Sequence, residues 1–151
     1  MTTLPTVGNQ GQTPDLDAMK VAVQRSLAAR YTERERDAAL RVFYHAKAHF
    51  HSSSGATLAR LLMGLYNGNR FQFDLTDLRL LDRSNFDAAM AVLTMDATKT
   101  CAEIHAVLDA LRGPHANTQA EIENWAFWLK HPKRCKKEHL PAIPPCEEVP
   151  L

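Results

Sequence analysis

The stretch FQFDLTDLRLLD, Phe71 to Asp82, decides the fold class, because its start is the only candidate for an extended segment in the chain. Phe71 to Asp74 alternates aromatic and polar residues as a strand does, whereas from Leu75 the leucines fall closer to helical spacing. We therefore predict a short extended hinge, Phe71-Asp74, that leads into a helical turn. Phe71 and Phe73 are expected to pack inward, and Asp74 is expected to cap the turn.

On both sides of this hinge the apolar residues recur every three or four positions, as in amphipathic helices. The most apolar stripe runs from Leu58 to Tyr66 and ends at Gly68, which predicts a deeply buried helix. Other stripes predict helices over about 14–30, 33–51, 84–111 and 118–131, of which the third is one long helix or two. The sequence therefore predicts an all-α, compact single-domain bundle of five to six helices.

Polar residues at the starts of these stripes predict where the helices begin. Serine, threonine and aspartate side chains accept hydrogen bonds from the free backbone N–H groups of a first helical turn. The expected caps are Thr13 for the first helix, a Thr32–Glu35 capping box for the second, Ser84 for the helix after the hinge and a Thr118–Glu121 capping box for the last.

Length and composition limit the organisation and the class of the protein. A chain of 151 residues with 45% hydrophobic residues can bury one sizeable core. We expect a flexible N-terminal arm at 1–12, a helical domain at 13–131 and a Pro-rich tail at 132–151 that runs from basic to acidic. The net charge of +1 excludes a strongly basic nucleic-acid-binding protein and an acidic DNA mimic as descriptions of the whole molecule. Three cysteines, no signal-like start and no long apolar run favour a cytoplasmic location without membrane insertion.

Two clusters of histidine and cysteine have the residue types of metal sites, although we favour a metal at neither. His45 and His49 lie four apart on one predicted helix, a spacing that lets two imidazoles reach one ion, but ordinary histidines on an amphipathic helix explain them more simply. A structural zinc that orders the tail is the second hypothesis, against a basic tail with incidental ligands. Its candidate ligands are His131, Cys135, His139 and Cys146.

No catalytic arrangement stands out, so we expect no enzyme. Cys101 and His105 are one helical turn apart, as in a thiolate–imidazolium pair. Cys101 shares a predicted face with Ile104 and Leu108, and we therefore expect it to be buried and structural. The glycines stand alone and form no phosphate-binding loop.

The chain from Arg36 to about Pro132 carries a Ser-Gly before a Leu-rich helix, an Asn after it, and FDLTDL at Phe73 to Leu78. This order resembles an uncharacterised bacterial family of helical domains carried mainly on plasmids and integrative conjugative elements. Such relatives usually have glycines before the Phe and a Trp after LTDL, whereas this chain reads RFQ at 70–72 and has Arg79 after the motif. The resemblance brings no activity with it.

What the resemblance implies is a small cytoplasmic accessory protein of a mobile genetic element. Many such elements carry non-enzymatic proteins that disable a host defence complex, including the anti-CRISPR proteins. We therefore expect protein–protein binding, with a CRISPR effector or another defence subunit as the partner. The protein would occlude or displace this subunit and would not act as a DNA mimic. The alternative is a nucleic-acid-binding accessory protein that uses the basic segment Lys130–Lys137. The candidate partner contacts are Arg79, Arg83, Trp128, Lys133 and Arg134.

Overall fold

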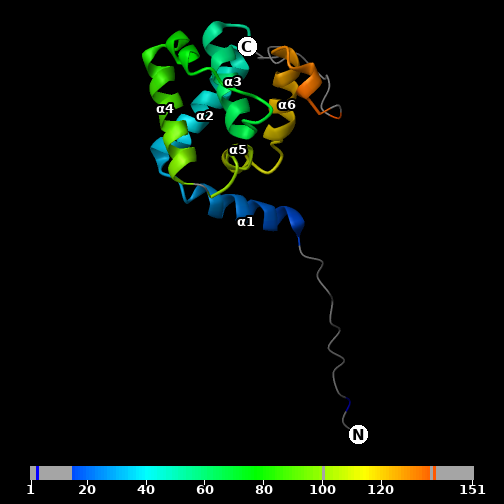
Figure 1. Cartoon of the computed structure of the whole chain (residues 1–151). Helices are drawn as coiled ribbons and strands as arrows, with labels where there is room; N and C mark the ends of the chain where they lie inside the picture. The colour runs from blue at the N-terminus through cyan, green and yellow to red at the C-terminus, as the bar shows by residue number, and fades with distance from the viewer. Residues whose placement is uncertain (1–2, 4–14, 100, 137, 139–151) are drawn as a thin grey trace.

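The computed structural model describes residues 3, 15–99, 101–136 and 138, and every regular element among them is a helix (Figure 1). The all-α prediction is therefore confirmed, while the predicted arm at 1–12 and most of the predicted tail lie outside the described residues. No described helix is long and apolar enough to cross a membrane. The elements are α1 (Leu16–Ala28), α2 (Glu33–Ala48), α3 (Ser53–Tyr66), the 3-10 helix η1 (Leu75–Leu80), α4 (Arg83–Thr98), α5 (Ile104–Arg112), α6 (Thr118–Trp128) and the 3-10 helix η2 (Pro132–Arg134).

The hydrophobic core lies where α3 meets its neighbours. The central pair α2 and α3 lies between α4 on the left of Figure 1 and α6 on the right, and α1 runs along the lower edge against α5. Helix α3 has more buried residues than any other described helix, as its apolar stripe predicts. The largest fully buried apolar side chains are Val42, Phe43, Leu58, Leu62, Met63, Phe71, Met95, Ile104, Leu108, Ile122 and Trp125.

The helix caps agree with the sequence prediction at α2 and differ from it at three other helices. Thr32 and Glu35 form the expected capping box, with N–H to oxygen distances of 2.9 and 3.2 Å. Asp15 caps α1, so the Thr13 prediction is wrong, and Thr13 itself lies outside the described residues. Asp82 caps α4 through the N–H of Asn85 at 2.8 Å, so Ser84 is not the cap. In both places an aspartate oxygen, which accepts at least as well as a hydroxyl, takes the capping position.

The predicted capping box at the start of α6 is also wrong, because its threonine is used elsewhere. Asn117 caps this helix through the N–H of Ala120 at 3.2 Å. The hydroxyl of Thr118 is buried and donates to Asp109 of α5 at 2.6 Å, and the Thr118 N–H donates to the same carboxylate at 2.8 Å. A tertiary contact between α5 and α6 thus outweighs the local pattern.

The stretch that follows α3 has the predicted shape. Phe71 is buried, Phe73 packs partly buried against the core, and residues 71–74 form no regular structure. Asp74 caps η1 by accepting from the N–H of Thr76 at 2.8 Å. The predictions of inward-facing aromatics and of an Asp74 cap are confirmed.

The long stripe from 84 to 111 forms two helices, because the chain leaves helical geometry between α4 and α5. Cys101 lies in this connection and not on a helix face, and its side chain is exposed. The prediction of a buried, structural Cys101 is wrong, since the apolar periodicity that suggested it begins only at Ile104.

A glycine allows α2 and α3 to approach closely at their junction. A methyl group at Gly55 would overlap the backbone carbonyl of His49 at the end of α2. Ser52 caps α3 by accepting from the Gly55 N–H at 3.1 Å. Any larger residue at this position would force the two helices apart.

Candidate partner-binding surface

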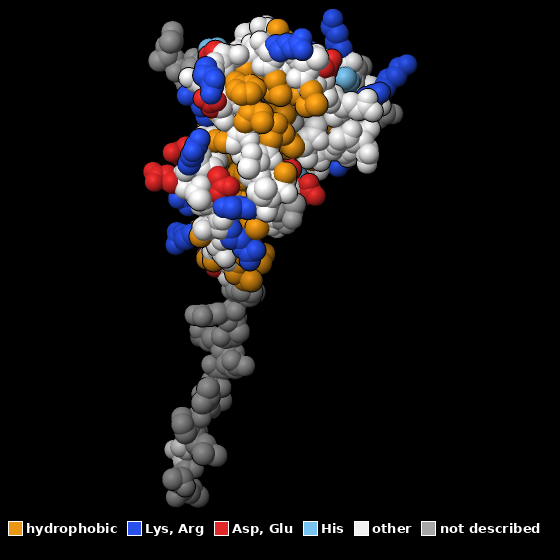
Figure 2. All heavy atoms as spheres, turned by 60° about the vertical axis from the view of Figure 1, so that its left-hand side comes forward, with side chains coloured by type: hydrophobic (Ala, Val, Ile, Leu, Met, Phe, Trp, Pro, Cys, Tyr) orange, Lys and Arg blue, Asp and Glu red, His pale blue; other side chains and the backbone are white. Residues whose placement is uncertain are grey.

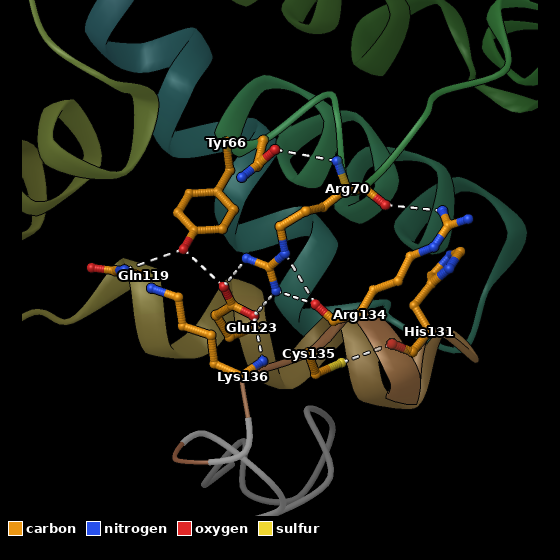
Figure 3. A network of polar contacts seen from close by, with 9 residues as sticks. Tyr66, Arg70, Gln119, Glu123, His131, Arg134, Cys135 and Lys136 are labelled. Carbon is orange, nitrogen blue, oxygen red and sulfur yellow. Dashed lines mark hydrogen bonds and ion pairs between the residues drawn. The ribbon is translucent and has the colours of Figure 1, made fainter.

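A buried ion pair fixes the segment between α3 and η1. The carboxylate of Glu123, on α6, is fully buried, and the guanidinium of Arg70 reaches it with two parallel bonds of 2.5 and 2.7 Å (Figure 3). Such a bidentate arrangement sets both the distance and the orientation of the arginine. Arg70 is thus anchored to α6 although it belongs to the loop after α3.

Other donors complete the surroundings of this carboxylate. The Tyr66 hydroxyl donates to Glu123 at 2.8 Å and the Lys136 N–H at 3.2 Å, while Gln119 donates to the Tyr66 oxygen at 3.2 Å (Figure 3). Burial alone would raise the pKa of Glu123, but the hydrogen bonds from Arg70, Tyr66 and Lys136 outweigh it and lower this pKa to about 2. The group is therefore an anionic structural anchor at neutral pH rather than a proton donor.

Arg70 also ties the segment around η2 to the loop after α3. Its Nε donates to the carbonyl of Arg134 at 3.0 Å, and Nη1 of Arg134 donates back to the carbonyl of Arg70 at 2.9 Å (Figure 3). Cys135 Sγ donates to the carbonyl of His131 at 3.1 Å. Two segments 64 residues apart in sequence are thereby held side by side.

Beside this anchor lies an open apolar groove of about 500 Å³ between α3, the 67–74 segment, η1 and α4. Leu75 on its wall is 72% exposed. Figure 2 shows hydrophobic side chains gathered on this face, with Lys and Arg side chains around them. The residues that line the groove are Leu61, Gly64, Leu65, Gly68, Phe71, Gln72, Phe73, Leu75 and Leu93.

Glycines keep this groove open along α3. Gly64 and Gly68 are four residues apart, and a Cβ at Gly64 would lie 3.4 Å from both the Phe71 carbonyl and the Phe73 Cβ. A side chain at either position would occupy part of the groove. The two glycines therefore provide space here rather than unusual backbone angles.

A group of basic residues, Lys130, Lys133 and Arg134, adjoins the groove, and we call it the basic edge. Together with His131 it lines a depression of about 350 Å³. The ring of His131 lies 5.9 Å from that of Phe71, which lines the groove, so the two features are neighbours. Burial and the positive charges of Arg134 and Arg60 lower the pKa of His131, which therefore adds no charge at neutral pH.

The five predicted partner contacts fall into two groups. Arg79 on η1 and Arg83 at the start of α4 are exposed, and Arg83 pairs with Asp87 at 3.0 Å. Trp128 at the end of α6 is 37% exposed, and Lys133 and Arg134 follow on η2. Arg134 has a structural role as well, because it holds the Arg70 carbonyl. The apolar groove was not part of the prediction.

The described residues contain no group of three or more metal-ligand side chains. His131 and Cys135 are linked by the bond from Cys135 Sγ to a backbone carbonyl, while His139 and Cys146 lie outside the described residues. Within the described part of the chain, no third side chain joins His131 and Cys135 in a possible metal site.

The helical histidine pair is engaged with polar neighbours. The rings of His45 and His49 lie 4.5 Å apart. His45 Nε2 is 3.1 Å from the Ser54 hydroxyl and 3.3 Å from Nδ2 of the buried Asn85. Burial and the nearby His49 lower the pKa of His45. This geometry supports a neutral, hydrogen-bonded His45 that joins α2 to α3 and α4.

Comparison with known proteins gives one match. No curated protein and no solved structure matches the chain. A model of a family of unknown function, DUF7673, matches residues 36–126, which is more than half of the chain and includes most of α2, all of α3 to α5 and most of α6. The match contains the groove-lining residues and Glu123, and it leaves out α1 and η2. The chain therefore belongs to this family of unknown function.

Proposed function

We propose that this protein is a non-enzymatic binding protein that holds a segment of a partner protein in the groove between α3, η1 and α4. The observation that carries the proposal is an open apolar groove of about 500 Å³ whose residue Phe71 contacts His131 beside the basic edge. Contiguous exposed apolar surface with a charged rim is characteristic of protein-binding sites.

The two parts of the site suggest the chemistry of the bound segment. Apolar side chains would fill the space above Gly64 and Gly68 and cover Leu75. Acidic side chains at the end of the segment near Phe71 would meet the positive charges of Lys130 and Lys133, which are not neutralised by an ion pair in the described chain. The proposed ligand is therefore an apolar segment followed or preceded by acidic residues.

The partner class that we propose is a subunit of a host defence complex, bound by an accessory protein of a mobile genetic element. This part rests on the resemblance of the FDLTDL region, Phe73 to Leu78, to domains carried on mobile elements. The net charge of +1 favours occlusion or displacement of a protein subunit over mimicry of DNA. A CRISPR effector is the first candidate.

A tagged pull-down from a bacterium with CRISPR and other defence systems tests the proposal. The extract is treated with nuclease and washed at moderate salt, and the bound proteins are identified by mass spectrometry. We expect a stoichiometric protein partner that is lost with Leu75→Glu and retained with Leu80→Glu. Both leucines are exposed on η1, but only Leu75 lines the groove, which makes the second variant a matched control.

Two results would contradict the proposal. A partner that binds both variants equally would place the interface away from the groove. Recovery of nucleic acid before nuclease treatment and of nothing after it would favour the basic segment as a nucleic-acid contact, and binding would then fall steeply with salt.

A further inference from the structure

Helix α1 carries apolar side chains that the described chain leaves uncovered. Leu16, Met19 and Val23 are 73%, 54% and 68% exposed, and α1 has no buried residue. The helix runs along the lower edge of the molecule in Figure 1, and hydrophobic side chains are visible at the lower end of the described atoms in Figure 2. Scattered exposed apolar residues are common, but three in one row along a helix indicate an interaction surface.

This helix is attached to the domain on one side only. It packs on α5, and Lys20 Nζ donates to the carbonyl of Pro114 at 2.7 Å. Between α1 and α5 lies an open groove of about 350 Å³, which is lined by Met19 and Val23 of α1 and by Ala106 of α5, among others. The family match begins at residue 36, so α1 lies outside the matched residues.

The row also carries opposite charges at its two ends. Arg30 stands at one end and Asp15 immediately precedes the other, and both residues are exposed. Neither side chain makes an ion pair with another residue of the described chain. The members recur at alternating steps of three and four, the spacing by which two helices pack along a seam. They are Leu16, Met19, Val23 and Ser26 on α1 and Arg30 in the turn that follows it.

We propose that α1 pairs with the α1 of a second copy of this chain, antiparallel about a two-fold axis near Val23. Val23 then meets the partner's Val23, and Asp15 lies opposite the partner's Arg30. A parallel arrangement would place like charges together at both ends, so charge complementarity selects the antiparallel one. A surface that complements itself in this way fits another copy of the same chain.

The contact is short, and the dimer is correspondingly weak. A helix of 13 residues presents a small area compared with a standard protein interface. We expect a dissociation constant of roughly 1 to 100 μM for the full chain. The groove between α3, η1 and α4 is not involved, so this inference does not rest on the proposed function.

Sedimentation equilibrium over about 1 to 500 μM of the full chain tests the inference directly. We expect the wild type to change from monomer to dimer in this range, and Val23→Glu to raise the dissociation constant by about tenfold or more. Asp15→Asn keeps a capping side chain and removes its charge, and it should weaken the dimer by about three- to tenfold. Leu75→Glu, an equally exposed substitution in the other groove, should leave the dimer unchanged. Circular dichroism verifies that each variant is folded.

Three outcomes would overturn the inference. The first is a monomer at every concentration, and the second is a dimer that Val23→Glu leaves intact. The third is a dimer that Leu75→Glu dissociates, which would assign self-association to the groove on α3. Each of these is distinct from the pull-down result that decides the proposed function.

Discussion

Arg70 and Glu123 form a bidentate ion pair, with bonds of 2.5 and 2.7 Å, between the loop after α3 and the interior of α6. The carboxylate is fully buried, and the arginine is stacked over the ring of the next residue, Phe71, at 4.7 Å. The pair therefore fixes the position of the loop at which the chain leaves α3 and begins to line the groove. Its loss should disturb stability and the groove together.

The first prediction concerns the removal of one partner of this pair. Arg70→Ala leaves a buried negative charge without its main counter-ion, and we expect a loss of about 3 to 5 kcal/mol in the free energy of unfolding. The control is Arg83→Ala, which breaks an exposed pair with Asp87 and should cost less than about 1 kcal/mol. Urea unfolding of the two variants measures both values. Similar losses of unfolding free energy in Arg70→Ala and Arg83→Ala would show that the buried pair stabilises the fold no more than the exposed pair does.

The second prediction concerns acid stability. The pKa of Glu123 is lowered from 4.5 to about 2 in the folded protein, so its contribution is fully present above pH 4.5 and is lost as the pH falls towards 2. Between these values the free energy of unfolding should fall by about 3 kcal/mol more in the wild type than in Glu123→Gln, which cannot titrate there. Denaturant titrations at several pH values give the comparison. Parallel pH profiles would mean that another carboxylate dominates acid unfolding.

The third prediction concerns the centre of the core. Leu62 is fully buried in α3, and Leu62→Ala should lower the free energy of unfolding by about 2 to 5 kcal/mol through lost burial and the cavity left behind. Leu80→Ala removes the same atoms from an exposed site and should cost less than about 1 kcal/mol. Thermal and urea unfolding report both. A loss below about 1 kcal/mol for Leu62→Ala would contradict its central position.

The fourth prediction concerns the junction of α2 and α3. Gly55→Ala introduces a methyl group where the His49 carbonyl stands, and we expect a loss of about 3 kcal/mol or more, because backbone atoms must move. At Gly64 the nearest atoms to a new Cβ are 3.4 Å away, so Gly64→Ala should leave the stability unchanged or raise it by up to about 1 kcal/mol. The same denaturant assay separates the two. An equally stable Gly55→Ala variant would show that the two helices can move apart at little cost.

Local patterns predicted the helices well because each of α2 to α6 buries one side of the helix in the core. The stripe from Leu58 to Tyr66 became the most buried helix, and the shift of period after Asp74 marked the start of η1. Helix starts were harder to predict, since several neighbouring polar residues compete for each cap. At Thr118 the hydroxyl bonds to Asp109, a contact with another helix that no local pattern contains.

The candidate site was predictable only in part. Exposed cations such as Lys133 can be selected from sequence, because charge is visible there. Glu123 could not be selected from sequence, because it has the pattern of an ordinary acidic residue on a helix. Its partners Arg70 and Tyr66 lie 53 and 57 residues away in sequence, and only the fold brings them to it. The groove depends on the same long-range arrangement. Cys101 was wrongly expected to be buried, because the helical periodicity that begins at Ile104 was extended to residues before the start of α5.

The segment between Arg70 and Asp74 is held at both ends, by the ion pair with Glu123 on one side and by the cap of η1 on the other. One wall of the groove is thus shaped during folding, and its conformational entropy is lost then and not on association. A ligand for such a preorganised wall meets it in the binding-competent form at every encounter. Differences in affinity among ligands are then expected to arise mainly from how long each complex lasts and not from how fast it forms.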